Sequence, residues 1–193
     1  LEEPCTLIKA GNDHPVGEMV LALVAPFPTV QDEVSVEELK GFWQGGESEN
    51  FNRLILYPYV LDALTWLWGE PVGSVEVFDR ITFKTPDEKG EYYQSFMKEA
   101  WTSERTWAII AFEELNPRWK VIALDGQSPI HKSFDSEQYA LTIPLTLYNE
   151  DATRLQDTIE YMASTQFEDL LPFSNYDSEK LTTVILTGVT AMA

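Results

Sequence analysis

The chain is poor in cysteine, histidine and basic side chains. Cys5 is the single cysteine among 193 residues, so an internal disulfide is excluded and the redox compartment stays open. Lysine and arginine together number 13 against 32 acidic residues, and the net charge is −19. Nucleic acid and anionic lipid both attract basic surfaces, so this charge argues against either partner. It favours a well-solvated acidic surface, or cationic ligands and metal ions in the medium.

Long apolar runs and a leader are also lacking. No run reaches the about 18 residues that a transmembrane helix needs, so we predict no direct membrane insertion. The segment Leu1-Glu2-Glu3-Pro4 is not the small, apolar context that precedes a lipid-attachment cysteine. We therefore expect a soluble chain, either as it stands or after removal of a leader.

Motifs of catalysis and cofactor binding are lacking as well. The sequence has neither a G-x-S-x-G elbow nor a glycine-rich phosphate loop. Its two histidines, His14 and His131, lack the spacing of a metal site, and we predict both at the surface. Asp125-Gly126 is typical of a turn rather than of a calcium loop. We predict no catalytic residue, no metal and no cofactor in this chain.

The strongest structural signal lies at residues 19–46. Hydrophobic residues make up 44% of the sequence, which indicates a globular protein, and Met19 to Ala25 has the composition of a buried strand. Prolines then break the run. Ser35 opens a helix, and Glu38 three residues later completes a capping box. This is an α/β unit, and its connecting loop lies where open α/β sheets hold ligands.

The rest of the chain continues the alternation of strands and helices. Further strands are predicted at 53–57, 74–78, 107–112, 119–124, 141–148 and 182–189, and helices at 58–68, 92–101 and 151–162. Residues 107–112 are the best candidate for a central strand, and Pro144 suggests an edge strand or a bulge. We predict an α/β fold with a mixed, mainly parallel sheet flanked by helices. It would span residues 1–180, with 181–193 the start of a following domain or a truncation.

Several segments between residues 19 and 148 occur in an order that resembles a known family. One is an S-x-x-x-L-x-x-x-(F/W)-x-G helix, followed by the strand at 106–110, a V-x-x-L-x-G-x-S-P run and a Y-x-L-x-x-P-L strand. The matching residues are Ser35, Leu39, Trp43, Gly45, Val121, Leu124, Gly126, Ser128, Pro129, Tyr139, Leu141, Pro144 and Leu145. The order is similar to that of the second lobe of type II periplasmic solute-binding proteins, of the phosphate- and molybdate-binding type.

A narrower resemblance rests on APFPTV, SVEELKGFWQG, DGQSP and LTTVILTGVTAMA. These segments resemble the amino-terminal part of CapA-like capsule-synthesis proteins, which are linked to poly-γ-glutamate and carry a metallophosphatase-like domain. The resemblance implies a non-enzymatic, extracytoplasmic binding region with its leader removed, and the rest of the parent protein as its partner. The family's metal-binding G-D pair is absent, because Val189 follows Gly188. No metal ligand is therefore implied in this chain.

The family resemblance also bears on the ligand. The serine- and glycine-containing loop that holds an oxyanion would fall near Tyr57-Pro58-Tyr59, where neither residue type occurs. Together with the net charge, this argues against phosphate or another small oxyanion, and it leaves a different small molecule or an anionic polymer as the ligand. We expect a cleft that offers backbone N–H groups, hydroxyls and stacking surface. Its predicted residues are Phe27, Thr29, Tyr57, Tyr59, Gln127 and Ser128.

Alternatives to this hypothesis stay open at the level of sequence. Aromatic residues at helical spacing lie more often in a core than in a pocket, but Tyr57 and Tyr59 are the better candidates for a pocket because they flank the carboxyl end of a strand. The absence of the oxyanion loop favours a second interpretation, a structural or interaction domain with a degenerate cleft. A third interpretation is a fragment of a metallophosphatase-like enzyme whose catalytic residues lie outside this chain.

Overall fold

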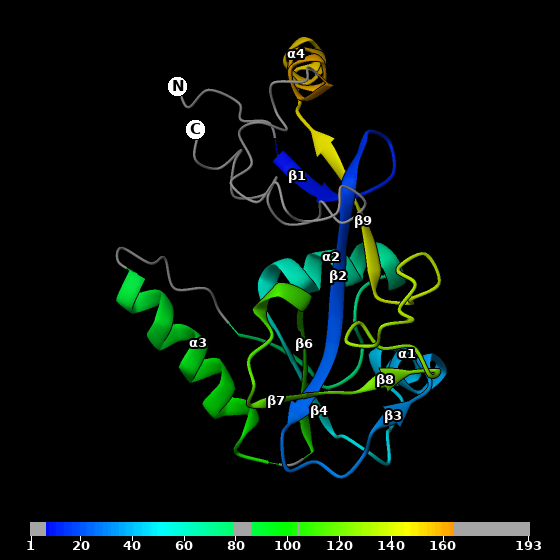
Figure 1. Cartoon of the computed structure of the whole chain (residues 1–193), viewed down its shortest axis with the longest axis vertical. Helices are drawn as coiled ribbons and strands as arrows, with labels where there is room; N and C mark the ends of the chain where they lie inside the picture. Colours follow the sequence, from blue (N-terminus) through cyan, green and yellow to red (C-terminus); the bar gives the residue numbers. More distant parts are fainter. Residues whose placement is uncertain (1–6, 79–85, 104, 164–193) are drawn as a thin grey trace. The chain divides into compact units, whose positions relative to one another are not determined.

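The computed structural model describes residues 7–78, 86–103 and 105–163 (Figure 1). These residues belong to two compact units. One consists of residues 20–142, and the other combines residues from the stretches before 20 and after 142. The predicted strand at 182–189, the terminal segment 181–193 and Cys5 lie outside the described residues. Within the described ranges, no helix is long and apolar enough to cross a membrane.

The larger unit is built on a mixed sheet. Its strands are ordered β2 (Pro15–Pro26), β6 (Thr106–Ala111), β4 (Arg53–Leu56) and β5 (Val75–Val77). Strand β4 runs parallel to both β5 and β6, whereas β2 is antiparallel to β6. The mixed α/β fold predicted from the sequence is therefore confirmed. The sheet changes from parallel to antiparallel pairing at the ladder between β6 and β2.

The centre of this sheet is β6, as the sequence indicated. All six of its residues are buried, which is typical of a strand covered on both faces. Trp107 on β6 stacks on Phe51, with ring centroids 4.7 Å apart and an interplanar angle of 24°. Residues 107–111 thus form the middle of the core, because both faces of the strand meet other side chains rather than water. Phe112, the last residue of the predicted strand, begins a short 3-10 helix and is 37% exposed.

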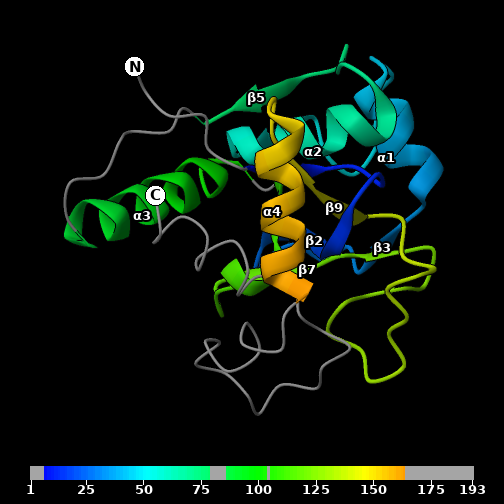
Figure 2. The same ribbon diagram turned by 90° about the horizontal axis from the view of Figure 1, so that it is seen from above.

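Helix α1 (Val36–Trp43) begins where the sequence indicated, and α2 (Pro58–Trp68) has the predicted bounds. Ser35 Oγ accepts a hydrogen bond of 3.0 Å from Glu38 N, which caps α1. Pro58 occupies the first turn of α2, and Gly69 ends that helix with φ +82°. The two helices lie close together (Figure 2), and the Trp43 indole donates to the Gly69 carbonyl at 2.8 Å.

The second half of the predicted capping box is replaced by another contact. The Glu38 carboxylate accepts hydrogen bonds from Ser48 Oγ at 2.5 Å and from Asn50 Nδ2 at 3.0 Å. It therefore fastens the loop between α1 and β4 instead of returning to the start of its own helix. A third helix, α3 (Pro86–Ala100), begins six residues before the helix predicted at 92–101, and its Tyr92, Phe96 and Ala100 are buried.

The strand predicted at 119–124 is divided in two. Strand β7 (Trp119–Val121) is antiparallel to the end of β2, and β8 (Ala123–Leu124) is parallel to β3 (Glu33–Val34). The change of partner occurs at Ile122, whose N–H donates to Leu23 O at 2.9 Å. One continuous segment therefore belongs to two different sheets.

A tight turn follows β8. Leu124 and Gln127 each donate to the carbonyl of the other at 2.9 Å, and the two residues between them have positive φ, +47° at Asp125 and +77° at Gly126. Positive φ at both central positions is typical of a type I′ turn, for which Asp-Gly is a preferred pair. The turn predicted at Asp125-Gly126 is confirmed.

The smaller unit contains β1 (Leu7–Ala10), most of β9 (Thr142–Tyr148), the first residues of β2 and α4 (Ala152–Ala163). Strand β9 lies between β1 and β2, so the prediction of an edge strand at Pro144 was wrong. Pairing with β1 ends at Leu145, opposite Ala10, and Pro144 beyond it only accepts a bond, from Gly11 N at 2.9 Å. Since proline has no N–H, Pro144 cannot return a bond to Gly11, and the ladder with β1 ends before this pair.

Helix α4 agrees with the helix predicted at 151–162 to within one residue at each end. Leu155 and Ile159 are half-buried, and Ala152 is exposed.

Candidate functional site

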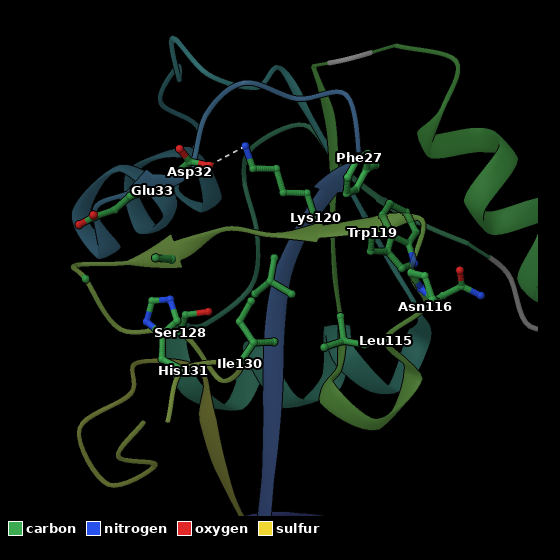
Figure 3. A pocket seen from close by; sticks show the side chains of 14 residues that line it. Phe27, Asp32, Glu33, Leu115, Asn116, Trp119, Lys120, Ser128, Ile130 and His131 are labelled. Atoms are coloured by element: carbon green, nitrogen blue, oxygen red, sulfur yellow. Dashed lines mark ion pairs between the residues drawn. The ribbon is translucent and has the colours of Figure 1, made fainter. Parts of the chain in front are cut away.

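A groove with a volume of about 750 Å³ lies in the larger unit (Figure 3). Its floor is the segment formed by β7 and β8. Three loops border it, at 27–33 after β2, at 115–117 before β7, and at 126–131 after β8. Sites for small organic molecules are typically about 300 to 1,000 Å³, so the groove has the size of a ligand site.

Lys120 is the only lysine or arginine that lines the described groove, and its ammonium group is fully engaged. It lies 2.7 Å from Asp32 Oδ1 and donates to the backbone carbonyls of Thr29 at 2.7 Å and Val30 at 3.1 Å. Figure 3 shows the side chain extending from the floor of the groove toward Asp32. An ammonium has three N–H donors, and three protein oxygens occupy them here.

Ser128 supplies a polar group without a partner. Ser128 is 2% exposed, and its Oγ makes no hydrogen bond to any described residue. The adjoining turn fixes its backbone, because Ser128 O accepts from His131 N at 3.0 Å. A buried hydroxyl without a partner costs about 1 to 3 kcal/mol. A solute that reaches this hydroxyl would recover part of that cost.

Apolar side chains form much of the remaining wall. Phe27 at the end of β2 is 65% exposed, and Ile130 in the 126–131 loop is 57% exposed. Both line the groove, and the more deeply buried Trp119 lies on its floor. An aromatic ring and an aliphatic side chain that remain in water can cover the apolar part of a bound molecule.

The start of helix α1, next to the groove, is already occupied by protein groups. Ser35 Oγ accepts from Glu38 N, and Asp125 Oδ2 lies 3.4 Å from Val36 N. The positive end of a helix attracts anions, and a carboxylate of the chain itself fills that role here.

Two of the predicted site residues line the groove. They are Phe27 and Ser128. Thr29 contributes its carbonyl to Lys120, and its Oγ1 is buried without a hydrogen-bond partner among the described residues. Gln127 lies in the type I′ turn beside Ser128 and does not line the groove.

The other two predicted site residues, Tyr57 and Tyr59, pack into an aromatic cluster with α3. Tyr57 is 3% exposed and stacks on Phe96, with centroids 4.1 Å apart. Tyr59 and Tyr93 donate their hydroxyls to the two carboxylate oxygens of Glu114, at 2.6 and 3.0 Å. Burial raises the pKa of both Tyr57 and Tyr59, and the nearby Glu114 carboxylate adds to the effect. Neither tyrosine is among the residues that line the groove.

Sequence reasoning missed the polar residues that distinguish the groove. Lys120 was treated only as part of an apolar strand, but it lines the groove. His131 is exposed, as predicted, and it also lines the groove. A lone lysine inside the run WKVIAL of an otherwise acidic chain was the available signal. For His131 and Asp32 no local signal existed, because tertiary structure brings their loops together. Among the described residues, no three His, Cys, Asp or Glu side chains are grouped as a metal site requires.

Comparison with known proteins identifies the fold. No family model matches the sequence, and no curated protein matches it either. An ABC-type phosphate transport receptor from Vibrio cholerae superposes with a TM-score of 0.57 and 12% identity, over 86% of this chain and 76% of the receptor. A protein proposed to bind phosphate from Planctomyces limnophilus gives a TM-score of 0.56 and 14% identity, over 98% of this chain and 73% of that protein.

A third solved structure agrees with these two. It is described as a phosphate ABC transporter substrate-binding protein from Clostridium perfringens with bound phosphate. The TM-score is 0.52 and the identity 10%, over 86% of this chain and 75% of the other. At these identities the likeness concerns the fold alone, and nothing in the comparisons supports the resemblance to CapA-like proteins. The chain has the mixed α/β fold of periplasmic solute-binding proteins.

Proposed function

We propose that this protein is a non-enzymatic solute-binding module that holds a small molecule in the groove over β7 and β8. The observation that carries the proposal is the Ser128 hydroxyl, which is buried at the groove without a hydrogen-bond partner among the described residues. A fold shared with substrate-binding proteins of transporters supports it, as does the volume of the groove. The same fold supports an extracytoplasmic location.

The proposal is tested by thermal unfolding of the purified chain in the presence of candidate solutes. A ligand at 100 times its Kd raises the free energy of unfolding by about 2.7 kcal/mol, which moves the midpoint visibly. Ser128→Ala should weaken binding at least tenfold, since one hydrogen bond in a buried site is lost.

The matched control is Thr142→Val, which removes a different buried hydroxyl that also lacks a partner among the described residues and does not line the groove. This variant should bind like the wild type. Binding that Ser128→Ala leaves unchanged would place the site elsewhere and defeat the proposal.

A second candidate function is a docking surface for a macromolecule, with a groove that holds no solute. Three apolar side chains at the 27–33 and 126–131 loops favour it, since Phe27, Val30 and Ile130 are 65%, 91% and 57% exposed. Light scattering across a range of concentrations tests for self-association through this surface. Replacing Phe27 and Ile130 by serine should abolish any such association.

The narrower CapA-like hypothesis rests on sequence segments alone. It adds a role in making poly-γ-glutamate, a parent protein beyond this chain and a removed leader. Deleting the gene in its own organism and measuring cell-associated poly-γ-glutamate tests it. An unchanged polymer level would remove the hypothesis and leave the solute-binding proposal intact.

A further inference from the structure

We infer that the groove selects uncharged solutes that carry hydroxyl or amide groups on an apolar frame, and that it rejects oxyanions such as phosphate. The inference rests on the proposed function, because it assumes that the groove is the binding site. It goes further by naming the class of ligand. Three features of the groove carry it.

The first feature is the saturation of the groove's lysine. Lys120 Nζ is bound by Asp32 Oδ1 and by the carbonyl oxygens of Thr29 and Val30, at 2.7 to 3.1 Å. An incoming oxyanion would have to displace one of these oxygens and would meet the Asp32 carboxylate beside it. Two like charges at about 4 Å repel each other by about 1 kcal/mol even in bulk water, and by more in a partly buried site.

The second feature is the occupation of the nearby helix start. An oxyanion at a helix N-terminus is bound by free backbone N–H groups. At α1 the Ser35 hydroxyl accepts from Glu38 N, and the Asp125 carboxylate lies 3.4 Å from Val36 N. Asp125 therefore stands where a bound anion would stand, and it repels one that approaches.

The third feature is the rest of the groove's lining. Glu33 also lines the groove, and its carboxylate is a further group that repels an anion. Ser128 offers an unused hydroxyl, and the His131 imidazole lies beside it. Phe27 and Ile130 offer apolar surface. Saccharides, nucleosides and small amides combine hydroxyl or amide groups with an apolar frame in this way.

Isothermal titration of the full chain tests the inference with three sets of probes. The first set contains neutral saccharides, nucleosides and amides; the second contains inorganic phosphate, sulfate and glutamate; the third contains arginine and spermidine. We expect the tightest binding within the neutral set, at least tenfold weaker binding to Ser128→Ala, and a Kd for phosphate weaker than about 1 mM.

A gain-of-function variant tests the role of the ion pair directly. Asp32→Asn leaves Lys120 with an unneutralised charge, and we expect its affinity for inorganic phosphate to exceed the wild-type value at least tenfold. The control is Asp62→Asn, which makes the same change in net charge at an exposed position of α2 that does not line the groove. It should leave phosphate binding unchanged.

The outcomes separate the inference from the proposed function. Phosphate or arginine binding as tightly as any neutral probe, with loss of affinity in Ser128→Ala, would overturn the inference and keep the groove as the site. No gain in Asp32→Asn over Asp62→Asn would also overturn it. No binding from any set, or binding indifferent to Ser128→Ala, would overturn the proposed function itself.

Discussion

The Lys120 ammonium on β7 lies 2.7 Å from the Asp32 carboxylate and also donates to two carbonyls of the 27–33 loop. One side chain thus holds the loop that follows β2. The ion pair alone is worth little, because Asp32 is 87% exposed. We expect Lys120→Met to lower the free energy of unfolding by about 1 to 2 kcal/mol, mainly through the lost bonds to the carbonyls.

Urea denaturation measures this loss, and hydrogen exchange localises it. The control is Lys98→Met, at an exposed position of α3, which should change stability by less than about 0.5 kcal/mol. Amide exchange in the 27–33 loop should accelerate only in Lys120→Met. Equal stability of the two variants would show that the loop does not depend on Lys120.

Removal of the Ser128 hydroxyl should stabilise the ligand-free protein. The hydroxyl is buried without a partner among the described residues, so Ser128→Ala relieves a desolvation cost. We expect a gain of up to about 1 kcal/mol in urea denaturation, together with the weaker ligand binding predicted above. Lower stability of the ligand-free variant would mean that Ser128 supports the fold rather than a solute.

Two glycine-to-alanine substitutions should change the stability of the protein in opposite directions. Gly126 has φ +77°, and a Cβ there would meet no atom within 4 Å, so Gly126→Ala suffers only the backbone strain of about 1 to 2 kcal/mol. Gly41 lies inside α1, also with open space around a Cβ. Gly41→Ala should stabilise by about 0.5 to 1 kcal/mol. Thermal unfolding of both variants measures the two changes in stability. If both variants were stabilised, the positive φ at Gly126 would be contradicted; if both were destabilised, the helical position of Gly41 would be.

Glu38 should matter more than its neighbour Glu37. Both lie in the first turn of α1, but only the Glu38 carboxylate accepts from Ser48 and Asn50. Glu38→Ala should cost about 1 to 2 kcal/mol in urea denaturation. Glu37→Ala serves as the control, because it removes the same charge from the same helix end and so cancels the dipole contribution. If the two variants lost the same free energy of unfolding, the contribution of Glu38 would come from the helix dipole and not from its contact with the loop.

Alkaline conditions should destabilise the protein through Tyr57. Burial raises the pKa of Tyr57 above its value in the unfolded chain, with Glu114 a smaller cause. The folded protein then keeps a proton that the unfolded chain releases above about pH 10. Stability is therefore intact below that pH and falls as the pH rises, by about 1.4 kcal/mol per pH unit for this one group.

The pH dependence is measured by urea denaturation between about pH 10 and 11. In Tyr57→Phe the free energy of unfolding should fall less steeply with pH, by about 1.4 kcal/mol per pH unit. Tyr148→Phe, at a residue that is 39% exposed, is the control and should leave the slope near the wild-type value. A slope unchanged in Tyr57→Phe would mean that this phenol is not buried in solution.

The parts of the fold that the sequence predicted are those with local causes. Ser35, Pro58 and Gly69 set helix ends through caps and fixed backbone angles, and the run at 107–112 is apolar enough to require burial. The break at Ile122 was not predictable, because WKVIAL has no local interruption. The break arises from the hydrogen bond of Ile122 to β2 and from the pairing of β8 with β3.

The candidate site was predictable only in part, for a similar reason. Phe27 and Ser128 follow strands, and both line the groove. Tyr57 and Tyr59 also follow a strand, but the aromatic side chains of α3 pack against Tyr57, and Tyr59 stacks on Tyr57. The spacing of the aromatic residues along α3 does not reveal which residue they contact. Asp32 and Lys120 are polar groups whose significance comes from their pairing across the fold.

The division of the 119–124 segment between two sheets has a consequence for synthesis of the chain. Lys120 and Thr29 are 91 positions apart, and Asp125 and Val36 are 89 apart. A nascent chain that has emerged only to β6 contains the strands of the central sheet but lacks the floor of the groove. Contacts between residues so far apart in sequence also form late in refolding. The entropy cost of closing the long loop between them must be met before the contact stabilises the fold. The groove is complete only after the chain has emerged through residue 131, so solute binding there would come later than the synthesis of the central strands.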